Sequence, residues 1–461
     1  MNMDDSTGGG RIVFYIDDQA ASALRTAAER TSVSGNARAA SDLSGLSLEV
    51  SLTGAVETSR TVPVQENAVV TFDSLPVGGT VRVKAKAFKQ IENYGAVSFY
   101  EGTSEPIVIQ EGNNAVSLPL AKIKQGLSVP LSLEAITAGT ITITNPWTTL
   151  KYTINGGALT AFPNAGSTSG SVTAAAGDVI CLYAEASGNT STSNTMQIGC
   201  SADCYVYGNV MSLVSLDGDD WKPNATELTT PYAFASLFKN NAFIRNHASK
   251  ALYLPATTLA EYCYYGVFNG CTSLTTAPAL PATTLAQYCY NGMFNGCTGL
   301  TASPELPATT LAEHCYSEMF NGCTGLTAAP ALPATTLVQF CYYSMFGGCT
   351  GLTTAPALPA TTLAQYCYYT MFYGCTSLTA SPVLRATTLV ANCYKDMFKN
   401  CSSLNSITCL ATVPSTPSDA LSGWVDGVAS SGTFYKAASA DWSSVDNGIP
   451  SGWAQENYTG N

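Results

Sequence analysis

The stretch PATTLAQYCYNGMFNGCTGLTASPEL occupies residues 281–306, and the chain carries six close copies of it in succession. The copies fill residues 255–410 without insertion or deletion, because their first residues lie 26 positions apart. These first residues are Pro255, Pro281, Pro307, Pro333, Pro359 and Arg385. A period this regular is typical of a solenoid, in which each repeat buries its apolar face against its neighbours.

Within each copy, apolar residues recur at spacings of three to five residues. In the first copy these are Leu259, Cys263, Val267, Phe268, Cys271 and Leu274. The spacing predicts the inward face of one short helix or pair of turns, which we expect Gly270 and its equivalents to end. Residues 274–280, broken by Pro278, predict a short strand and corner. Stacked copies would bury one continuous ladder of Phe, Met, Leu and Cys side chains.

The order Phe-x-x-Cys-x-x-Leu, repeated in every copy, resembles the BspA-like class of leucine-rich repeats. The matching residues are Phe268, Cys271 and Leu274; Phe294, Cys297 and Leu300; Phe320, Cys323 and Leu326; Phe346, Cys349 and Leu352; Phe372, Cys375 and Leu378; and Phe398, Cys401 and Leu404. The period is longer than in that family, and a cysteine stands five residues before each Phe instead of an aliphatic residue. The resemblance implies a leucine-rich-repeat α/β solenoid with terminal caps, on a bacterial cell-surface protein of a family that includes adhesins. It does not identify a ligand.

Two β-rich modules precede the repeats. Seven short stretches rich in β-branched and aromatic residues predict an immunoglobulin-like β-sandwich over residues 11–125. They are residues 12–16, 48–52, 68–72, 81–88, 96–100, 106–110 and 115–120. A helix is expected only at residues 20–30. Residues 126–225 predict a second β-rich module and linker, with strands at residues 140–144, 150–154, 179–184 and 204–208.

The two ends of the repeat array carry atypical sequence. Residues 226–254 predict an N-terminal capping repeat, in which Phe238 takes the place of Phe268. Residues 411–461 contain three tryptophans and predict a C-terminal cap with a strand at residues 432–436. Residues 1–10, MNMDDSTGGG, resemble the polar tether of mature surface lipoproteins. We therefore expect an outer-membrane lipoprotein at the cell surface, whose export signal and N-terminal lipid anchor are absent from this chain.

Composition restricts the class of partner. The formal net charge of −12 argues against nucleic acid, because a phosphate backbone requires a basic face. Only 11% of the residues are charged, as is common in secreted proteins. Since no run of about 18 apolar residues occurs, we expect membrane attachment only through the lipid anchor.

Twelve of the sixteen cysteines occupy the two recurring cysteine positions of the six repeats. Their Cys-x7-Cys spacing without histidine partners does not fit zinc. If Cys289 and Cys297 lay on one helix they would be about 12 Å apart, beyond disulfide reach. We therefore expect buried free thiols. Cys200 and Cys204 pair with one another, or either pairs with Cys181; the sequence leaves these alternatives open.

Catalytic and metal-binding motifs are absent from the sequence, so we expect no enzyme, no cofactor and no metal. The two histidines are His247, expected to be a capping residue, and His314, which replaces an aromatic residue of the other copies. The acidic stretch at residues 217–224 lacks calcium-loop spacing and is expected to be a solvated loop.

The positions that differ between copies are expected to face solvent, and several carry tyrosine. Together they predict an aromatic surface strip, consisting of Tyr262, Tyr265, Tyr288, Tyr343, Tyr366, Tyr369 and Tyr373. Such a strip suits a protein partner or stacking on sugars, or it simply covers the edges of the coils. The expected function is non-enzymatic binding of host proteins, other cells or glycans. The alternatives are a structural spacer or surface-fibre subunit, and a lipoprotein that captures polysaccharide.

Overall fold

The computed structural model describes residues 129–460 except 186–194, 218–219, 223–224, 413–418 and 443–447, and nine strands before residue 129. The chain separates into two compact units, Met1–Val129 and Pro130–Asn461. Each is described by itself.

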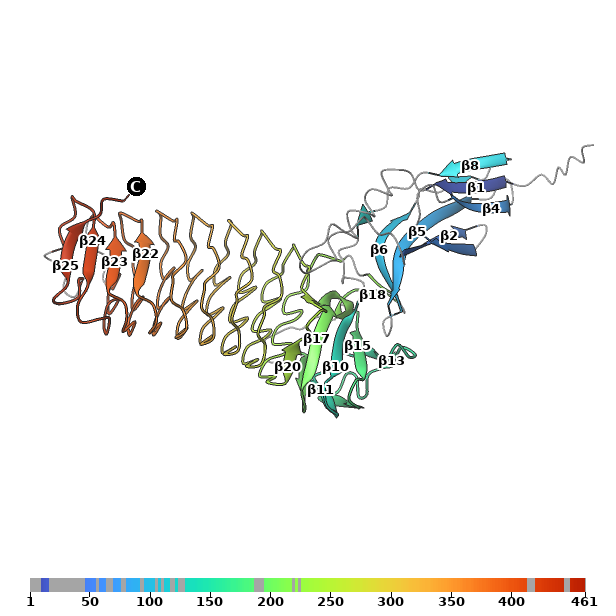
Figure 1. Ribbon diagram of the computed structural model, residues 1–461, viewed down its shortest axis with the longest axis horizontal. Helices are drawn as coiled ribbons and strands as arrows, with labels where there is room; N and C mark the ends of the chain where they lie inside the picture. Colours follow the sequence, from blue (N-terminus) through green and yellow to red (C-terminus); the bar gives the residue numbers. More distant parts are fainter. Residues whose placement is uncertain are drawn as a thin grey trace, which may run out of the picture. The chain divides into compact units, whose positions relative to one another are not determined.

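The nine described strands of the first unit form two sheets (Figure 1). Its strands are β1 (Gly10–Tyr15), β2 (Leu46–Gly54), β3 (Thr58–Pro63), β4 (Val69–Leu75), β5 (Thr80–Ile91), β6 (Gly95–Thr103), β7 (Ile107–Val108), β8 (Gly112–Val116) and β9 (Ala121–Lys122). One sheet has the order β4-β1-β8, and the other β3-β2-β5-β6-β9 with β7 paired to β5. Each of the seven predicted stretches overlaps a strand, whereas β3 and β9 were not predicted. The helix expected at residues 20–30 lies outside the described residues.

The second unit begins with a two-sheet module. Its strands are β10 (Leu131–Ala135), β11 (Gly139–Thr144), β12 (Lys151–Ile154), β13 (Thr160–Ala161), β14 (Ser169–Ala174), β15 (Val179–Tyr183), β16 (Gln197–Cys200) and β17 (Cys204–Asn209). The order β13-β12-β15-β10-β17 forms one sheet and β14-β11-β16 the other. The alternating burial of β11 and β14 shows why they form one face of a core: every second side chain is apolar and buried.

The module passes directly into the repeat array. A 3₁₀ helix, η1 (Val210–Leu213), and a short hairpin of β18 (Leu216–Asp217) and β19 (Asp220–Trp221) follow β17. Strands β20 (Ile244–Asn246) and β21 (Leu252–Tyr253), from the first coil of the array, then pair in parallel with β17. One continuous cluster of buried apolar residues extends from Leu131 to Trp453. The sheet of the module therefore covers the first coil of the array.

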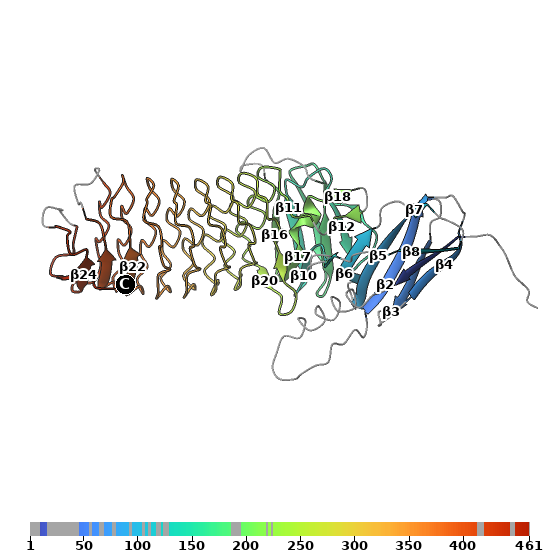
Figure 2. The same ribbon diagram turned by 90° about the horizontal axis from the view of Figure 1, so that it is seen from above.

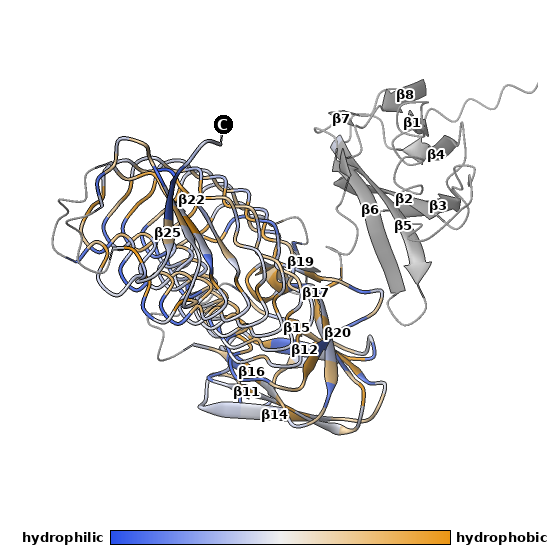
Figure 3. Ribbon diagram, turned by 60° about the vertical axis from the view of Figure 1, so that its left-hand side comes forward, coloured by the Kyte–Doolittle hydropathy of each residue, from blue (hydrophilic) through white to orange (hydrophobic). Residues whose placement is uncertain are grey.

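The array itself corrects the predicted fold class. The described residues contain no α-helix, so the repeats are not an α/β leucine-rich-repeat solenoid. Each coil is instead a succession of turns, and successive coils lie side by side along the array (Figures 1 and 2). Apolar and polar segments alternate around the coils (Figure 3).

A left-handed residue at every fourth position explains why no helix forms. In the first copy Tyr262, Gly266 and Gly270 have φ of 56°, 56° and 74°, which interrupts any run of helical dihedrals. Between them the chain makes tight turns, such as the 3.1 Å bond that the Tyr265 N–H donates to the Tyr262 carbonyl. Gly270 thus belongs to a recurring turn and does not end a helix.

The remaining backbone donors join neighbouring coils. The N–H groups of Gly266, Phe268 and Gly270 donate to the carbonyls of Asn291, Met293 and Asn295 at 2.9, 2.9 and 2.7 Å. Half of the amides in this segment therefore bond within the coil and half bond to the next coil. A solenoid without helices or long strands thereby satisfies its buried backbone.

The strand predicted at residues 274–280 of each copy forms only isolated bridges in most coils, for example between Thr276 and Ala302. A full parallel sheet appears at the C-terminal end. It consists of β22 (Ala380–Leu384), β23 (Ser406–Cys409), β24 (Thr433–Lys436) and β25 (Ala454–Asn457), in that order. The predicted strand at residues 432–436 coincides with β24. Trp424, fully buried, stacks on Tyr394 and covers the last copy.

Candidate functional site

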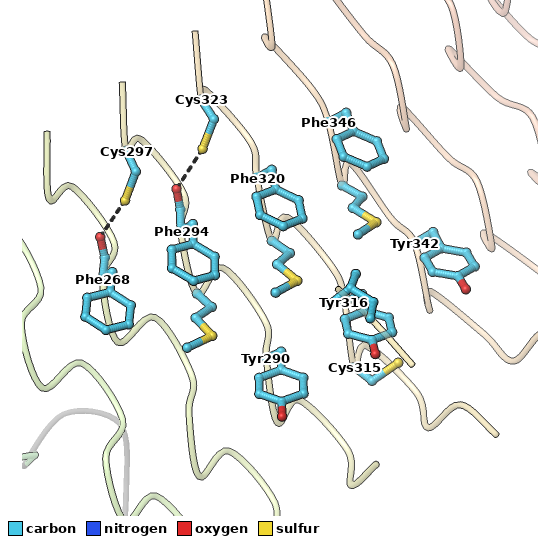
Figure 4. Packing of buried hydrophobic residues seen from close by; sticks show 14 of the residues in the cluster. Phe268, Tyr290, Phe294, Cys297, Cys315, Tyr316, Phe320, Cys323, Tyr342 and Phe346 are labelled. Atoms are coloured by element: carbon cyan, nitrogen blue, oxygen red, sulfur yellow. Dashed lines mark hydrogen bonds between the residues drawn. The ribbon is translucent and has the colours of Figure 1, made fainter. Parts of the chain in front are cut away.

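Two columns of buried rings form the interior of the array. The first stacks at centroid distances of 5.4–5.7 Å and consists of Phe238, Phe268, Phe294, Phe320, Phe346, Phe372 and Phe398. The second stacks at 5.7–6.0 Å and consists of Phe234, Tyr264, Tyr290, Tyr316, Tyr342, Tyr368 and Tyr394. Figure 4 shows parts of both columns. All these rings are buried. The Phe column confirms the predicted apolar ladder, whereas the buried Tyr column was not predicted.

The array cysteines are buried free thiols, as predicted. Six of them also donate a hydrogen bond, because each S–H meets the carbonyl of a Phe in the preceding coil. Cys297 donates to the Phe268 carbonyl at 2.9 Å and Cys323 to the Phe294 carbonyl at 3.0 Å (Figure 4). Burial raises the pKa of these thiols; that of Cys297 is about 12. They are therefore protonated donors and part of the core.

A third column of rings lies at the surface, and we call it the surface ring column. It consists of Tyr232, Tyr262, Tyr288, His314, Phe340 and Tyr366, all partly exposed. Neighbouring rings are 4.3–4.7 Å apart between centroids and within 15° of parallel. This distance is close to the roughly 4.8 Å spacing of paired strands, so the rings face one another along the array. Within the column, the face of each ring is therefore covered by the neighbouring ring.

The backbone beneath this column is strained in every coil. Its six residues have φ between 55° and 59°, a region that bulky residues rarely adopt. Such a residue costs about 1 kcal/mol or more relative to the right-handed region. At the equivalent positions beyond the column, Asn392 and Asp419 supply side chains that tolerate this conformation. The chain therefore keeps aromatic residues at positions where asparagine or glycine would adopt the left-handed φ at a lower conformational energy.

A second group of tyrosines flanks the surface ring column. Tyr265 contacts the Tyr262 ring at 5.9 Å, and Tyr369 contacts the Tyr366 ring at 5.8 Å, both in tilted arrangements. Tyr343 packs its ring against Phe340 edge to face at 6.0 Å. We call Tyr265, Tyr343 and Tyr369 the flanking tyrosines. Since their rings are tilted, they are not part of the stack.

The titratable rings of the column are neutral at neutral pH, although carboxylates lie beside them. Burial, together with Tyr288, Tyr232 and Glu261, raises the pKa of Tyr262 to about 12. Burial also lowers the pKa of His314, although the nearby Glu313 opposes the shift. The Nδ1 of His314 lies 3.2 Å from the Ser317 hydroxyl. At neutral pH the column therefore presents neutral ring edges and hydroxyl groups.

The structure divides the seven predicted strip residues into three sets. Tyr262, Tyr288 and Tyr366 belong to the surface ring column, and Tyr265, Tyr343 and Tyr369 flank it. Tyr373 occupies a different repeat position, where it is 40% exposed and accepts a 3.2 Å bond from Asn400 Nδ2.

The prediction missed three rings of the column: Tyr232, His314 and Phe340. These three residues occupy the same repeat position as Tyr262, Tyr288 and Tyr366, and that shared position could have identified them. A search restricted to tyrosine does not find His314 and Phe340.

His247 has a structural role in its turn. Its Nδ1 accepts bonds from the Ser249 and Lys250 N–H groups at 3.1 Å each. Its ring packs against Tyr205 and Tyr207. It therefore caps this local turn and packs against β17.

Among the described residues, no group of three or more His, Cys, Asp or Glu side chains is placed to hold a metal ion. The same part of the chain contains no helix long and apolar enough to cross a membrane. Comparison of the chain with models of protein families, with curated proteins and with solved structures finds no match.

Proposed function

We propose that this chain is a non-enzymatic, adhesin-like binding protein of a bacterial cell surface, held there by an N-terminal lipid anchor. Two sequence features support the location: the resemblance of the repeats to BspA-like proteins and of residues 1–10 to a lipoprotein tether. The structure contributes a surface suited to binding, the surface ring column with its flanking tyrosines. The partner is a protein on a host or on another cell.

The observation that carries the proposal is the retention of rings at strained backbone positions. Five successive coils, and the capping coil before them, hold an aromatic ring at φ near 57° although only part of each ring is buried. Local strain retained in five of the six copies is typical of functional positions. Tyrosine edges and hydroxyl groups are also the side-chain groups that dominate protein interfaces.

The stacking favours a protein partner over a glycan. A sugar that stacks on an aromatic side chain requires an open ring face, but centroid distances of 4.3–4.7 Å leave no room for another ring within the column. Among the flanking tyrosines, the Tyr369 ring already has neighbours that limit the access of a sugar. Lys395 Nζ lies 5.9 Å from the centroid of this ring, and Tyr343 packs against it. Polysaccharide capture therefore remains the weaker alternative.

A structural role is the second candidate, and one observation favours it. Strand β25 ends the C-terminal sheet, and all four of its residues are exposed. An edge strand of this kind can pair with another chain. If the chain were a surface-fibre subunit, it would self-associate, and a proline at Gln455 would abolish the association.

The experiment is binding of the full chain to immobilised extracellular-matrix and cell-surface proteins, beside a panel of glycans. One variant changes the flanking residues Tyr265, Tyr343 and Tyr369 to Ala. A matched control changes the exposed threonines Thr283, Thr309 and Thr335 to Ala at another position of the coils. We expect saturable binding to a protein that the tyrosine variant loses and the threonine variant keeps. Equal binding by all three chains would show that this surface is not the binding site. Concentration-dependent self-association without binding would favour the structural role.

A further inference from the structure

Two of the three cysteines that precede the repeats meet where the two sheets of the module approach each other. Cys200 is the last residue of β16, in the sheet β14-β11-β16. Cys204 is the first residue of β17, in the other sheet. Only three residues separate them, so the chain crosses from one sheet to the other between the two thiols. A covalent bond here would join the two sheets.

The two sulfur atoms are already in contact, with Cys200 Sγ 2.8 Å from Cys204 Sγ. A disulfide bond is about 2.05 Å long, so a displacement of less than an ångström would allow the bond to form. Cys204 is only 2% exposed, whereas Cys200 is partly exposed. Cys200 therefore lies nearer the surface than Cys204.

The pair also touches the first coil of the array. Asn241, a buried residue of that coil, donates from Nδ2 to the Ile198 carbonyl at 3.0 Å and to Cys200 Sγ at 3.5 Å. The amide therefore contacts the edge of β16 next to the pair. A bond between the two thiols would fix the edge on which the array begins.

The other cysteines are engaged differently. Six array thiols donate to Phe carbonyls, as Cys271 does to the Phe238 carbonyl at 3.0 Å. The other array thiols are fully buried. Cys181 lies 3.4 Å from the Ser132 hydroxyl on the neighbouring strand. The contact of Cys200 with Cys204 therefore singles out one of the pairings that the sequence leaves open.

We propose that Cys200 and Cys204 form a redox site that closes to an intramolecular disulfide by exchange with a low-molecular-weight disulfide. The Cys200 thiolate attacks one sulfur of that disulfide, so that a mixed disulfide forms and one external thiolate leaves. Cys204 then gives its proton to an external thiolate released from the reagent, and its own thiolate attacks the Cys200 sulfur and releases the second external thiolate. Two protein thiols are oxidised and one external disulfide is reduced to two thiols.

The hydrogen bond between the two sulfur atoms supports these roles. Either sulfur atom can donate in this contact, and donation by Cys204 lowers the pKa of Cys200 and raises that of Cys204. The more exposed residue is thus also the one whose thiolate form is favoured, as an attacking cysteine requires. The buried Cys204 acts second, when the mixed disulfide has brought a leaving group next to it.

The test uses the full chain, first reduced and then incubated with oxidised glutathione. The chain is denatured in a light alkylating reagent, reduced, and treated with a heavy one, so that peptide mapping distinguishes free from oxidised cysteines. We expect heavy label on Cys200 and Cys204 and light label on all the others. Light label on both residues would overturn the proposal, as would heavy label on the array cysteines in their place. This measurement needs no substitution.

Two substitutions assign the order of attack. Cys204→Ser should stop the reaction at a stable glutathione adduct on Cys200. Cys200→Ser should slow the reaction with oxidised glutathione at least tenfold, because the remaining thiol is buried. Cys181→Ser is the matched control and should retain the labelling of the unsubstituted chain. An adduct on Cys204 in the Cys200→Ser chain, formed at the original rate, would reverse the assigned roles and contradict the mechanism.

Discussion

The buried Phe column and the surface ring column run through the same coils with the same period, yet they differ in sequence and geometry. The buried column has Phe in every copy and centroid distances of 5.4–5.7 Å. The surface column mixes Tyr, His and Phe, stacks at 4.3–4.7 Å, and lies on left-handed backbone. A close-packed core admits one shape, whereas the surface position requires only a flat ring. The uniform buried column therefore marks positions that the fold requires, and the mixed surface column marks positions that are available for binding.

The largest expected effect tests the buried half of the comparison. Changing Phe320 to Ala leaves a cavity between Phe294 and Phe346, and should lower the free energy of unfolding by about 3–5 kcal/mol. Chemical denaturation of the full chain measures it. Loss of less than about 1 kcal/mol would contradict the assignment of this column as core.

A second prediction sharpens the comparison within the buried layer. Cys323 has a carbonyl acceptor at 3.0 Å, whereas Cys315 donates no hydrogen bond among the described residues. Serine at position 323 can donate to the same Phe294 carbonyl, but serine at position 315 would bury a hydroxyl group without that acceptor. Cys315→Ser should therefore cost about 1–3 kcal/mol, and Cys323→Ser about 1 kcal/mol or less. Equal losses in parallel denaturation curves would show that the thiol hydrogen bond has no stabilising role.

The sequence predicted the buried column better than the path of the backbone. The Phe-x-x-Cys-x-x-Leu order identified the inward residues, because burial depends on apolar spacing alone. The helix prediction was wrong because spacings of three to five residues fit consecutive turns as well as a helix. Gly292 and Gly296, four residues apart, were the signal for turns, since both adopt left-handed φ. A bulky residue such as Tyr288 in that conformation could not be predicted, because its intrinsic preference opposes it.

The candidate site was predicted in part for a related reason. A search for variable tyrosines found Tyr262, Tyr288 and Tyr366 of the surface ring column. It missed His314 and Phe340 because stacking depends on a planar ring and not on a hydroxyl group. Whether Tyr265 lies inside or beside the stack depends on the tilt of its ring, and the sequence carries no information about that angle.

A third prediction tests the surface half with the same residue type. Phe340→Ala removes a partly exposed ring and should cost only about 1 kcal/mol, far less than Phe320→Ala. Phe340→Asn should cost still less, because asparagine tolerates the φ of 57° that position 340 requires. Denaturation of the three variants side by side gives the order. If Phe340→Asn were the least stable of the three, strain beneath the surface ring column could not be part of the explanation.

The smallest effect concerns His314, the one column residue whose charge changes near neutral pH. Burial lowers its pKa from the ordinary value of 6.5 in the folded chain, so the unfolded chain binds the proton more tightly. Stability should therefore fall as the pH drops through about 6.5, and level off below the folded pKa.

The variant His314→Phe places in this copy the ring that Phe340 supplies in the next, and removes the titration. Unfolding midpoints at about pH 7.5 and about pH 5.5 should diverge between the two chains, with the unsubstituted chain losing more on acidification. Because the two chains differ only at position 314, the difference between them isolates His314. An equal loss would mean that the surface ring column accommodates a charged ring as readily as a neutral one, and its stacking would then not depend on the neutral state of His314.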